Sequence, residues 1–121
     1  MFTIDSICAE RKLSPSFVKI DAEGFEWEVV RGGLRVLETT RPAILVEVST
    51  SPDVQRSMWL ALADLGYRCY WAVRASAGPQ PRIQFIPIET IDAFLEAGAG
   101  ADARDDEERD FVFVQPDDRF V

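Results

Sequence analysis

The sequence predicts an α/β fold, in which helices join parallel strands. Two apolar segments, residues 17–21 and 43–48, have the length of buried strands, and a helical pattern interrupted by Gly32 and Gly33 separates them. A third observation is the regular helical pattern of residues 52–65, which follows directly. Strands and helices that alternate in this way are typical of βαβ units and therefore of a parallel sheet.

The composition is that of one small domain with a hydrophobic core. With 121 residues and 47% hydrophobic content, we expect a single domain over residues 1–121, which is short for a complete doubly wound enzyme. The net charge of −8, with no basic stripe, argues against nucleic acid and membrane partners, since both are polyanions. Because the chain has no histidine, acid–base chemistry must fall to carboxylates, lysine, tyrosine or thiol.

The two cysteines favour a reducing compartment. Cys8 and Cys69 lie far apart and form no CxxC motif, so we expect reduced, buried thiols and a cytoplasmic protein, with a disulfide disfavoured. No segment approaches the roughly 20 apolar residues that span a bilayer. The N-terminus also lacks the basic and apolar regions of a secretory signal.

The first elements are a short helix and a strand. Thr3 is a favourable N-cap residue, and apolar residues that share one helix face follow it. These are Ile4, Ile7 and Cys8. Pro15 ends the helical region, and the strand of residues 17–21 comes next.

Acidic residues gather where the second helix begins, at the end that the helix dipole makes favourable for negative charge. They are Glu23, Glu26 and Glu28. We expect its apolar face to consist of Phe25, Val29 and Val30. Gly32 and Gly33 interrupt this helix, residues 34–37 predict another turn or two, and Pro42 stops it before the strand of residues 43–48.

The helix over residues 52–65 has the clearest signals in the chain. Ser51 supplies a capping hydroxyl and Pro52 suits the first helical position. Apolar residues recur on one face, and Gly66 stands where a left-handed cap is expected. The apolar residues are Val54, Met58, Ala61, Leu62 and Leu65.

The remaining segments complete the pattern. The aromatic-rich residues 67–73 predict a third strand, residues 75–82 a loop, and residues 83–88 either a strand or an extended loop. Ile91, Phe94 and Leu95 then predict a short helix that Gly98 closes. We expect an acidic flexible loop over residues 99–110, followed by a last strand over residues 111–115.

Charged residues at the carboxyl end of the first strand indicate a functional site. Lys19, Asp21 and Glu23 break an apolar run at the point where it turns into a helix. Open α/β sheets bind ligands at the carboxyl ends of their strands. Charge at this position therefore usually has a chemical reason, and we place the chemistry here.

The order of these motifs resembles the FkbM family of S-adenosylmethionine-dependent methyltransferases. The resemblance runs from about Thr3 to Val48 and then more loosely to Phe120. The residues that carry it are Lys19-Ile20-Asp21-Ala22-Glu23-Gly24, then Glu26, Arg31-Gly32, Arg41-Pro42 and Glu47.

The resemblance implies a Rossmann-like methyltransferase sheet with helices on both faces and an antiparallel last strand between the fifth and sixth. Residues 17–21 and 43–48 look like the fourth and fifth strands, and residues 67–73 and 111–115 like the sixth and seventh. The first three strands, with their glycine-rich cofactor turn, have no counterpart. The chain thus resembles the C-terminal half of such an enzyme, lacking the N-terminal cofactor-binding half.

The implied reaction moves a methyl group from S-adenosylmethionine to a hydroxyl of a sugar or secondary metabolite, a small-molecule acceptor. Asp21 and Gly24 look like cofactor-binding positions. Asp21 could also accept a hydrogen bond from the acceptor; the alternative is a turn acid bonded to backbone amides. Glu23 could help to orient the acceptor hydroxyl, or it could stabilise the helix N-terminus.

Glu47 on the neighbouring strand has two interpretations. It could act as general base for the acceptor hydroxyl, or it could pair with Lys19, which would then be structural support for the site. The catalytic candidates are accordingly Asp21, Glu23 and Glu47. Three scattered carboxylates are a weak signal for Mg²⁺, and we predict no metal.

A second class of function is a non-catalytic α/β association module. If the strand of residues 17–21 has no neighbour on one side, its unpaired amides form an exposed sheet edge. Such an edge favours self-association or pairing with a partner chain.

Overall fold

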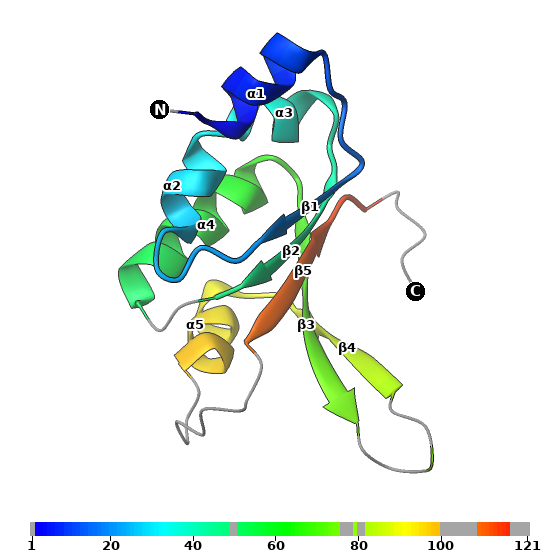
Figure 1. Ribbon diagram of the computed structural model, residues 1–121. Helices are drawn as coiled ribbons and strands as arrows, with labels where there is room; N and C mark the ends of the chain where they lie inside the picture. Colours follow the sequence, from blue (N-terminus) through cyan, green and yellow to red (C-terminus); the bar gives the residue numbers. More distant parts are fainter. Residues whose placement is uncertain (1, 49–50, 76–78, 80–81, 100–108, 117–121) are drawn as a thin grey trace.

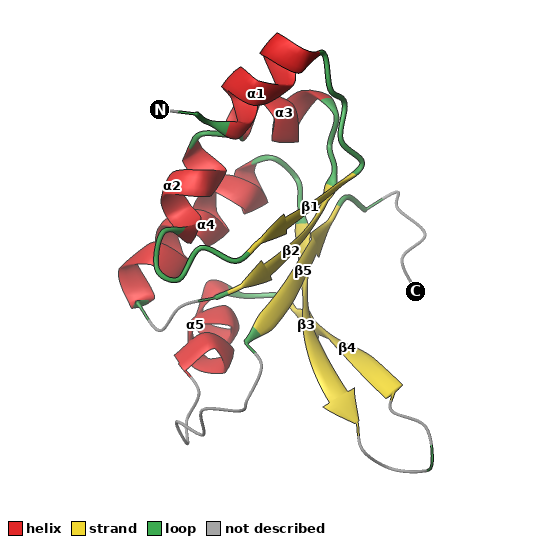
Figure 2. Ribbon diagram, viewed as in Figure 1, coloured by secondary structure: helices red, strands yellow, loops and turns green. Residues whose placement is uncertain are grey.

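The described residues form one mixed sheet of five strands with helices packed against it. The computed structural model describes residues 2–48, 51–75, 79, 82–99 and 109–116 (Figure 1). The strands lie in the order β1-β2-β5-β3-β4 (Figure 2). The strands are β1 (Phe17–Ile20), β2 (Ala43–Glu47), β3 (Arg68–Ala75), β4 (Arg82–Ile88) and β5 (Asp110–Val114). The helices are α1 (Ile4–Arg11), α2 (Glu26–Arg31), α3 (Leu34–Thr39), α4 (Pro52–Asp64) and α5 (Ile91–Ala99).

The strand directions agree with the expected α/β pattern. β1 and β2 are parallel neighbours, with Phe17 opposite Ala43 and Ile20 opposite Val46. β5 runs antiparallel to both β2 and β3 and lies between them, so the expectation for the last strand is confirmed. The ambiguous residues 83–88 are part of β4, which tolerates Pro87 because in the described sheet it is an edge strand.

The helices α2, α3, α4 and α5 pack against one face of the sheet, whereas α1 lies beside α3 (Figure 1). Side chains from α2, α3, α4 and α5 join Ile20, Ile44 and Phe113 in one core. Lys19 and Leu45 lie outside this core, because alternate strand residues point to opposite faces.

The expectation of helices on both faces is therefore wrong for the described residues. The crossovers from β1 to β2 and from β2 to β3 step across the sheet in the same direction. Parallel crossovers are right-handed, so two that step in one direction place their helices on one face. β1 is less buried than expected because it is an edge strand and the helices cover only one of its faces. Phe17 is 56% exposed, whereas Ile20 is buried.

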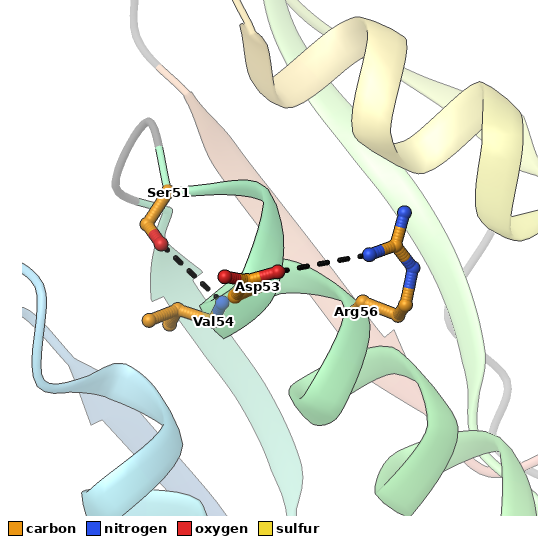
Figure 3. Close-up of polar contacts among 4 residues, drawn as sticks. All are labelled: Ser51, Asp53, Val54 and Arg56. Carbon is orange, nitrogen blue, oxygen red and sulfur yellow. Dashed lines mark hydrogen bonds and ion pairs between the residues drawn. The ribbon is translucent and has the colours of Figure 1, made fainter.

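The caps of α1 and α4 are those that the sequence predicts. Thr3 caps α1, accepting a hydrogen bond from the Ser6 amide. Ser51 caps α4 by accepting a hydrogen bond of 3.5 Å from the Val54 amide (Figure 3). Pro52 is the first residue of α4, and Gly66 follows the helix with a φ of 89°.

Two positions near the helices differ from the prediction. Gly98 lies inside α5 and does not end it; a Cβ atom there would come within 2.9 Å of the Gln55 side chain, so a small residue permits α4 and α5 to approach. Phe25, expected on the apolar face of α2, is 65% exposed. Most of the expected acidic loop, residues 100–108, lies outside the described residues.

Candidate active site at the carboxyl ends of β1 and β2

The parallel pairing of β1 and β2 brings two predicted site residues to one edge of the sheet. Ile20 of β1 lies opposite Val46 of β2 in the last pair. The next residue is Asp21 after β1 and Glu47 on β2. Both side chains are exposed. The register therefore puts Asp21 and Glu47 one residue beyond the last paired residues of two neighbouring strands, at the carboxyl end where ligands bind to sheets of this kind.

A tight turn that contains Glu23 follows directly after Asp21. The Phe25 amide donates a hydrogen bond of 3.1 Å to the Ala22 carbonyl, which closes a four-residue turn. Its central residues, Glu23 and Gly24, have φ values of 44° and 103°, and two successive positive values are typical of a type I′ turn. Gly24 is suited to this conformation, whereas Glu23 is an uncommon residue in it.

Glu23 lies before α2 and does not cap it. The structure gives α2 no side-chain N-cap hydrogen bond, and the residue at that position is Phe25. Glu23 is exposed in the turn. Its predicted contact with an acceptor hydroxyl remains a prediction.

Glu26, which the sequence analysis names among the acids at the start of the second helix but not among the site residues, is buried next to the turn. Its side chain is only 1% exposed, and its Oε1 accepts a hydrogen bond of 3.1 Å from the Gly24 amide. The other oxygen, Oε2, is buried and has no hydrogen-bond partner among the residues that the structure describes. Helical spacing carried the signal: Val30, a core residue of α2, is one turn further along and points the same way.

Lys19 lies on the sheet face away from the helices, opposite Leu45 on β2. Glu47 is two residues beyond Leu45, on the same face and diagonal to Lys19. This placement is compatible with the predicted ion pair and with Glu47 as a general base, so both remain predictions. On its other side, Glu47 lies opposite Asp110 of β5, which adds a further carboxylate to this edge.

The carboxyl edge is thus acidic, with Asp21, Glu23, Glu47 and Asp110 contributed by two parallel strands, a turn and β5. Among the described residues, no group of three or more histidine, cysteine, aspartate or glutamate side chains is arranged to hold a metal ion. These carboxylates would attract cationic and hydrogen-bond-donating groups.

A groove of about 630 Å³ lies elsewhere, at the amino end of β3 and the carboxyl end of β4. Its lining includes Trp59, Arg68 and Glu89 but none of the predicted site residues. It opens at the sheet edge opposite Asp21, because β3 runs parallel to β1. Ligands of open α/β sheets bind at carboxyl ends, so we assign the candidate site to the edge with Asp21.

Both cysteines are free thiols, as predicted. Cys69 is buried beside the groove, and burial raises the pKa of its thiol, so this group stays neutral. Cys8 is only partly buried, which differs from the expectation.

The chain is an α/β protein with a mixed sheet of five strands, and α/β proteins with open sheets bind ligands at the carboxyl ends of their strands. Residues 1–69, more than half of the 121, match the Methyltransferase FkbM domain, and the chain therefore belongs to the FkbM methyltransferase family. The matched part contains Asp21, Glu26 and Glu47, and the predicted resemblance is confirmed. Comparisons with curated proteins and with solved structures gave no match. In the described part of the chain, no helix is long and apolar enough to cross a membrane.

Proposed function

We propose that this chain carries the acceptor side of the active site of a cytoplasmic, S-adenosylmethionine-dependent O-methyltransferase. Membership of the FkbM family supports the class of reaction. The observation that carries the assignment of the site is the parallel register of β1 and β2, which brings Asp21 beside Glu47. The free thiols of Cys8 and Cys69 are compatible with the reducing cytoplasm.

The strand order supports a Rossmann-like methyltransferase sheet. β1, β2, β5 and β3 lie in the order and directions that the resemblance implies for strands four, five, seven and six. Among the described residues, no strand leads into a Gly-x-Gly turn. In our proposal, a further segment, in the same or a second polypeptide, supplies that turn and pairs with the open edge of β1.

The residues at the carboxyl edge suit a cationic cofactor. Asp21 and Glu23 are exposed carboxylates, and a Cβ atom on Gly24 would meet no atom within 4 Å, so a ligand can approach the backbone there. S-adenosylmethionine, when bound, supplies an electrophilic methyl group on a positively charged sulfur. Asp21 accepts a hydrogen bond from a donor of the cofactor or the acceptor, and Gly24 allows close approach.

Glu47 is the candidate general base. The acceptor hydroxyl loses its proton as its oxygen gains the methyl group, and an exposed carboxylate beside Asp21 is in position to take that proton. Glu23, two residues after Asp21, orients the hydroxyl. In the alternative, Glu47 pairs with Lys19 and positions the strand ends without touching the proton.

The experiment is turnover in the full-length gene product, measured as S-adenosylhomocysteine formed with a panel of sugar and metabolite hydroxyls. Glu47→Gln should lower kcat by about 10²–10⁴-fold if Glu47 is the base. Glu38→Gln, a change at an exposed residue of α3, is the matched control. Recovery of the Glu47→Gln activity by Lys19→Ala would instead favour the ion pair, and a parent protein without turnover would exclude the enzyme.

One observation favours association as a second candidate function. In the described sheet β1 pairs with β2 alone, and Phe17 on this edge strand is 56% exposed. An apolar strand edge of this kind invites another strand. We expect self-association in light scattering at high protein concentration; a monodisperse monomer would contradict it.

A further inference from the structure

We propose that Glu26 is a positioning residue, which holds the turn of residues 22–25 and thereby directs Asp21 and Glu23 toward the ligand. This inference rests on the proposed function. It assigns to Glu26 a role in ligand binding, exerted through the turn and not through contact with the reacting atoms.

The burial of Glu26 needs an explanation that packing does not give. Its side chain is 1% exposed in a part of α2 whose other buried residue, one helical turn along, is Val30. A carboxylate is costly to bury, and an apolar residue of similar size would fill the same space without that cost. A glutamate at this position therefore contributes something other than core stability.

Glu26 contributes a hydrogen bond to the turn of residues 22–25. In a turn closed by the Phe25 amide and the Ala22 carbonyl, the amide of Gly24 has no acceptor within the turn. Oε1 of Glu26 accepts a hydrogen bond of 3.1 Å from this amide. The bond reaches back two residues from the start of α2, so it ties the turn to a helix that is anchored in the core.

Glu23 makes such a tie necessary. Its φ of 44° lies in the left-handed region, which costs free energy for a residue with a side chain. A strained residue keeps its conformation only when its surroundings hold it. The hydrogen bond from Gly24 to Glu26 holds the peptide that joins Glu23 to Gly24, and the bond from Phe25 to Ala22 closes the turn around it.

The unpaired oxygen of Glu26 agrees with a positioning role. Oε2 is buried without a partner among the described residues, which leaves its desolvation uncompensated. A residue selected for stability would have both oxygens bonded or would be replaced by an apolar one. The structure keeps the carboxylate because one of its oxygens fixes the turn.

The first experiment measures the turn itself in the purified chain by NMR. Glu26→Leu keeps apolar bulk and removes the acceptor, so exchange of the Gly24 amide should accelerate by about tenfold, the equivalent of one hydrogen bond. Backbone order parameters of residues 21–24 should fall below about 0.6. Glu26→Gln keeps an oxygen for the amide and should restore most of the protection.

Glu28→Ala is the matched control, since Glu28 is an exposed acid on the same helix. It should leave residues 21–24 unchanged. If Glu26→Leu does not fold, Glu26→Met, with a more adaptable side chain, takes its place. Residues 21–24 that stay as ordered as in the unchanged chain would overturn the proposal.

The second experiment measures catalysis in the full-length gene product. Glu26→Leu should lower kcat/KM at least about tenfold, with Glu26→Gln within about threefold of the parent, because the turn survives in the amide variant. A loosened turn with unchanged kcat/KM would overturn the positioning role. A parent without turnover would refute the proposed function alone, and the NMR experiment would still decide whether Glu26 holds the turn.

Discussion

The amino and carboxyl ends of the parallel strands form two edges of the sheet, the amino edge and the carboxyl edge. These two edges differ in how completely their polar groups are paired. At the amino edge, the Tyr67 hydroxyl donates to the Pro42 carbonyl at 2.7 Å. Arg41 Nη2 donates to Gln115 Oε1 at 2.7 Å, and Gln115 Nε2 donates to the Leu65 carbonyl at 3.3 Å. The Tyr67 bond joins the segments that lead into β3 and β2. The Gln115 bonds join the residue after β5 to the segments that follow α3 and α4.

The carboxyl edge is less well satisfied. Glu26 Oε2 and Arg109 Nε are buried there without partners, and they are two of the three such atoms in the described structure. Arg109 belongs to this edge because its carbonyl accepts from the Val48 amide at 2.9 Å. Asp21 and Glu47, at the same carboxyl end of the sheet, are exposed.

The contrast assigns different tasks to the two edges. Paired buried groups stabilise a fold and keep it unique, whereas uncompensated groups cost stability and gather where a ligand binds. Substitutions at the amino edge should therefore lower the free energy of unfolding and spare ligand binding. Substitutions at the carboxyl edge should weaken ligand binding and leave the free energy of unfolding almost unchanged.

Gln115→Leu should have the largest effect on stability. Gln115 is buried, and the substitution removes its bonds to Arg41 and to the Leu65 carbonyl while it keeps an apolar side chain of similar size. We expect a loss of about 2–3 kcal/mol in the free energy of unfolding, since two partly buried hydrogen bonds are lost. Urea denaturation measures it.

Glu23→Gln at the carboxyl edge is the control for Gln115→Leu. Because Glu23 is exposed, this substitution should change the free energy of unfolding by no more than about 0.5 kcal/mol. Equal losses for the two variants would remove the distinction between the edges.

Two glycines with positive φ allow a matched comparison of backbone strain. Gly66 at the amino edge has a φ of 89° and Gly24 at the carboxyl edge a φ of 103°. A Cβ atom on Gly66 would lie 3.3 Å from Gln115 Oε1, whereas one on Gly24 would meet nothing within 4 Å.

Gly66→Ala should therefore cost more than Gly24→Ala. We expect about 2 kcal/mol against about 1 kcal/mol, because both variants pay for the left-handed conformation but only Gly66→Ala crowds a neighbour. Thermal unfolding of both variants under one set of conditions tests the order. The reverse order would mean that the turn at Gly24 is more tightly packed than the structure indicates.

The sequence predicts what local chemistry determines. The start of α4 follows from Ser51 and Pro52, and its end from Gly66, because capping depends on a few neighbouring residues. The meeting of Asp21 and Glu47 follows from the parallel pairing of two strands whose carboxyl ends share an edge.

What the sequence did not predict depends on tertiary packing. Glu26 stands at a helix start, where an exposed acid is also favourable, and only the packing of α2 decides that it is buried. Pro87 left the strand of β4 ambiguous until its edge position was known. The packing of the described helices on one face depends on the direction of two crossovers, which requires the strand order.

The smallest expected effect is that of S-adenosylmethionine on the isolated chain. The carboxyl edge offers carboxylates and the open backbone of Gly24, but these residues can contact only part of a cofactor that a glycine-rich turn would otherwise hold. Titration calorimetry should give a Kd weaker than about 1 mM, a binding free energy of at most about 4 kcal/mol. Asp21→Asn should weaken even this residual binding, while Gln115→Leu should leave it unchanged. Micromolar affinity in the isolated chain would mean that the carboxyl edge is a complete cofactor site, and the unpaired atoms there would need another explanation.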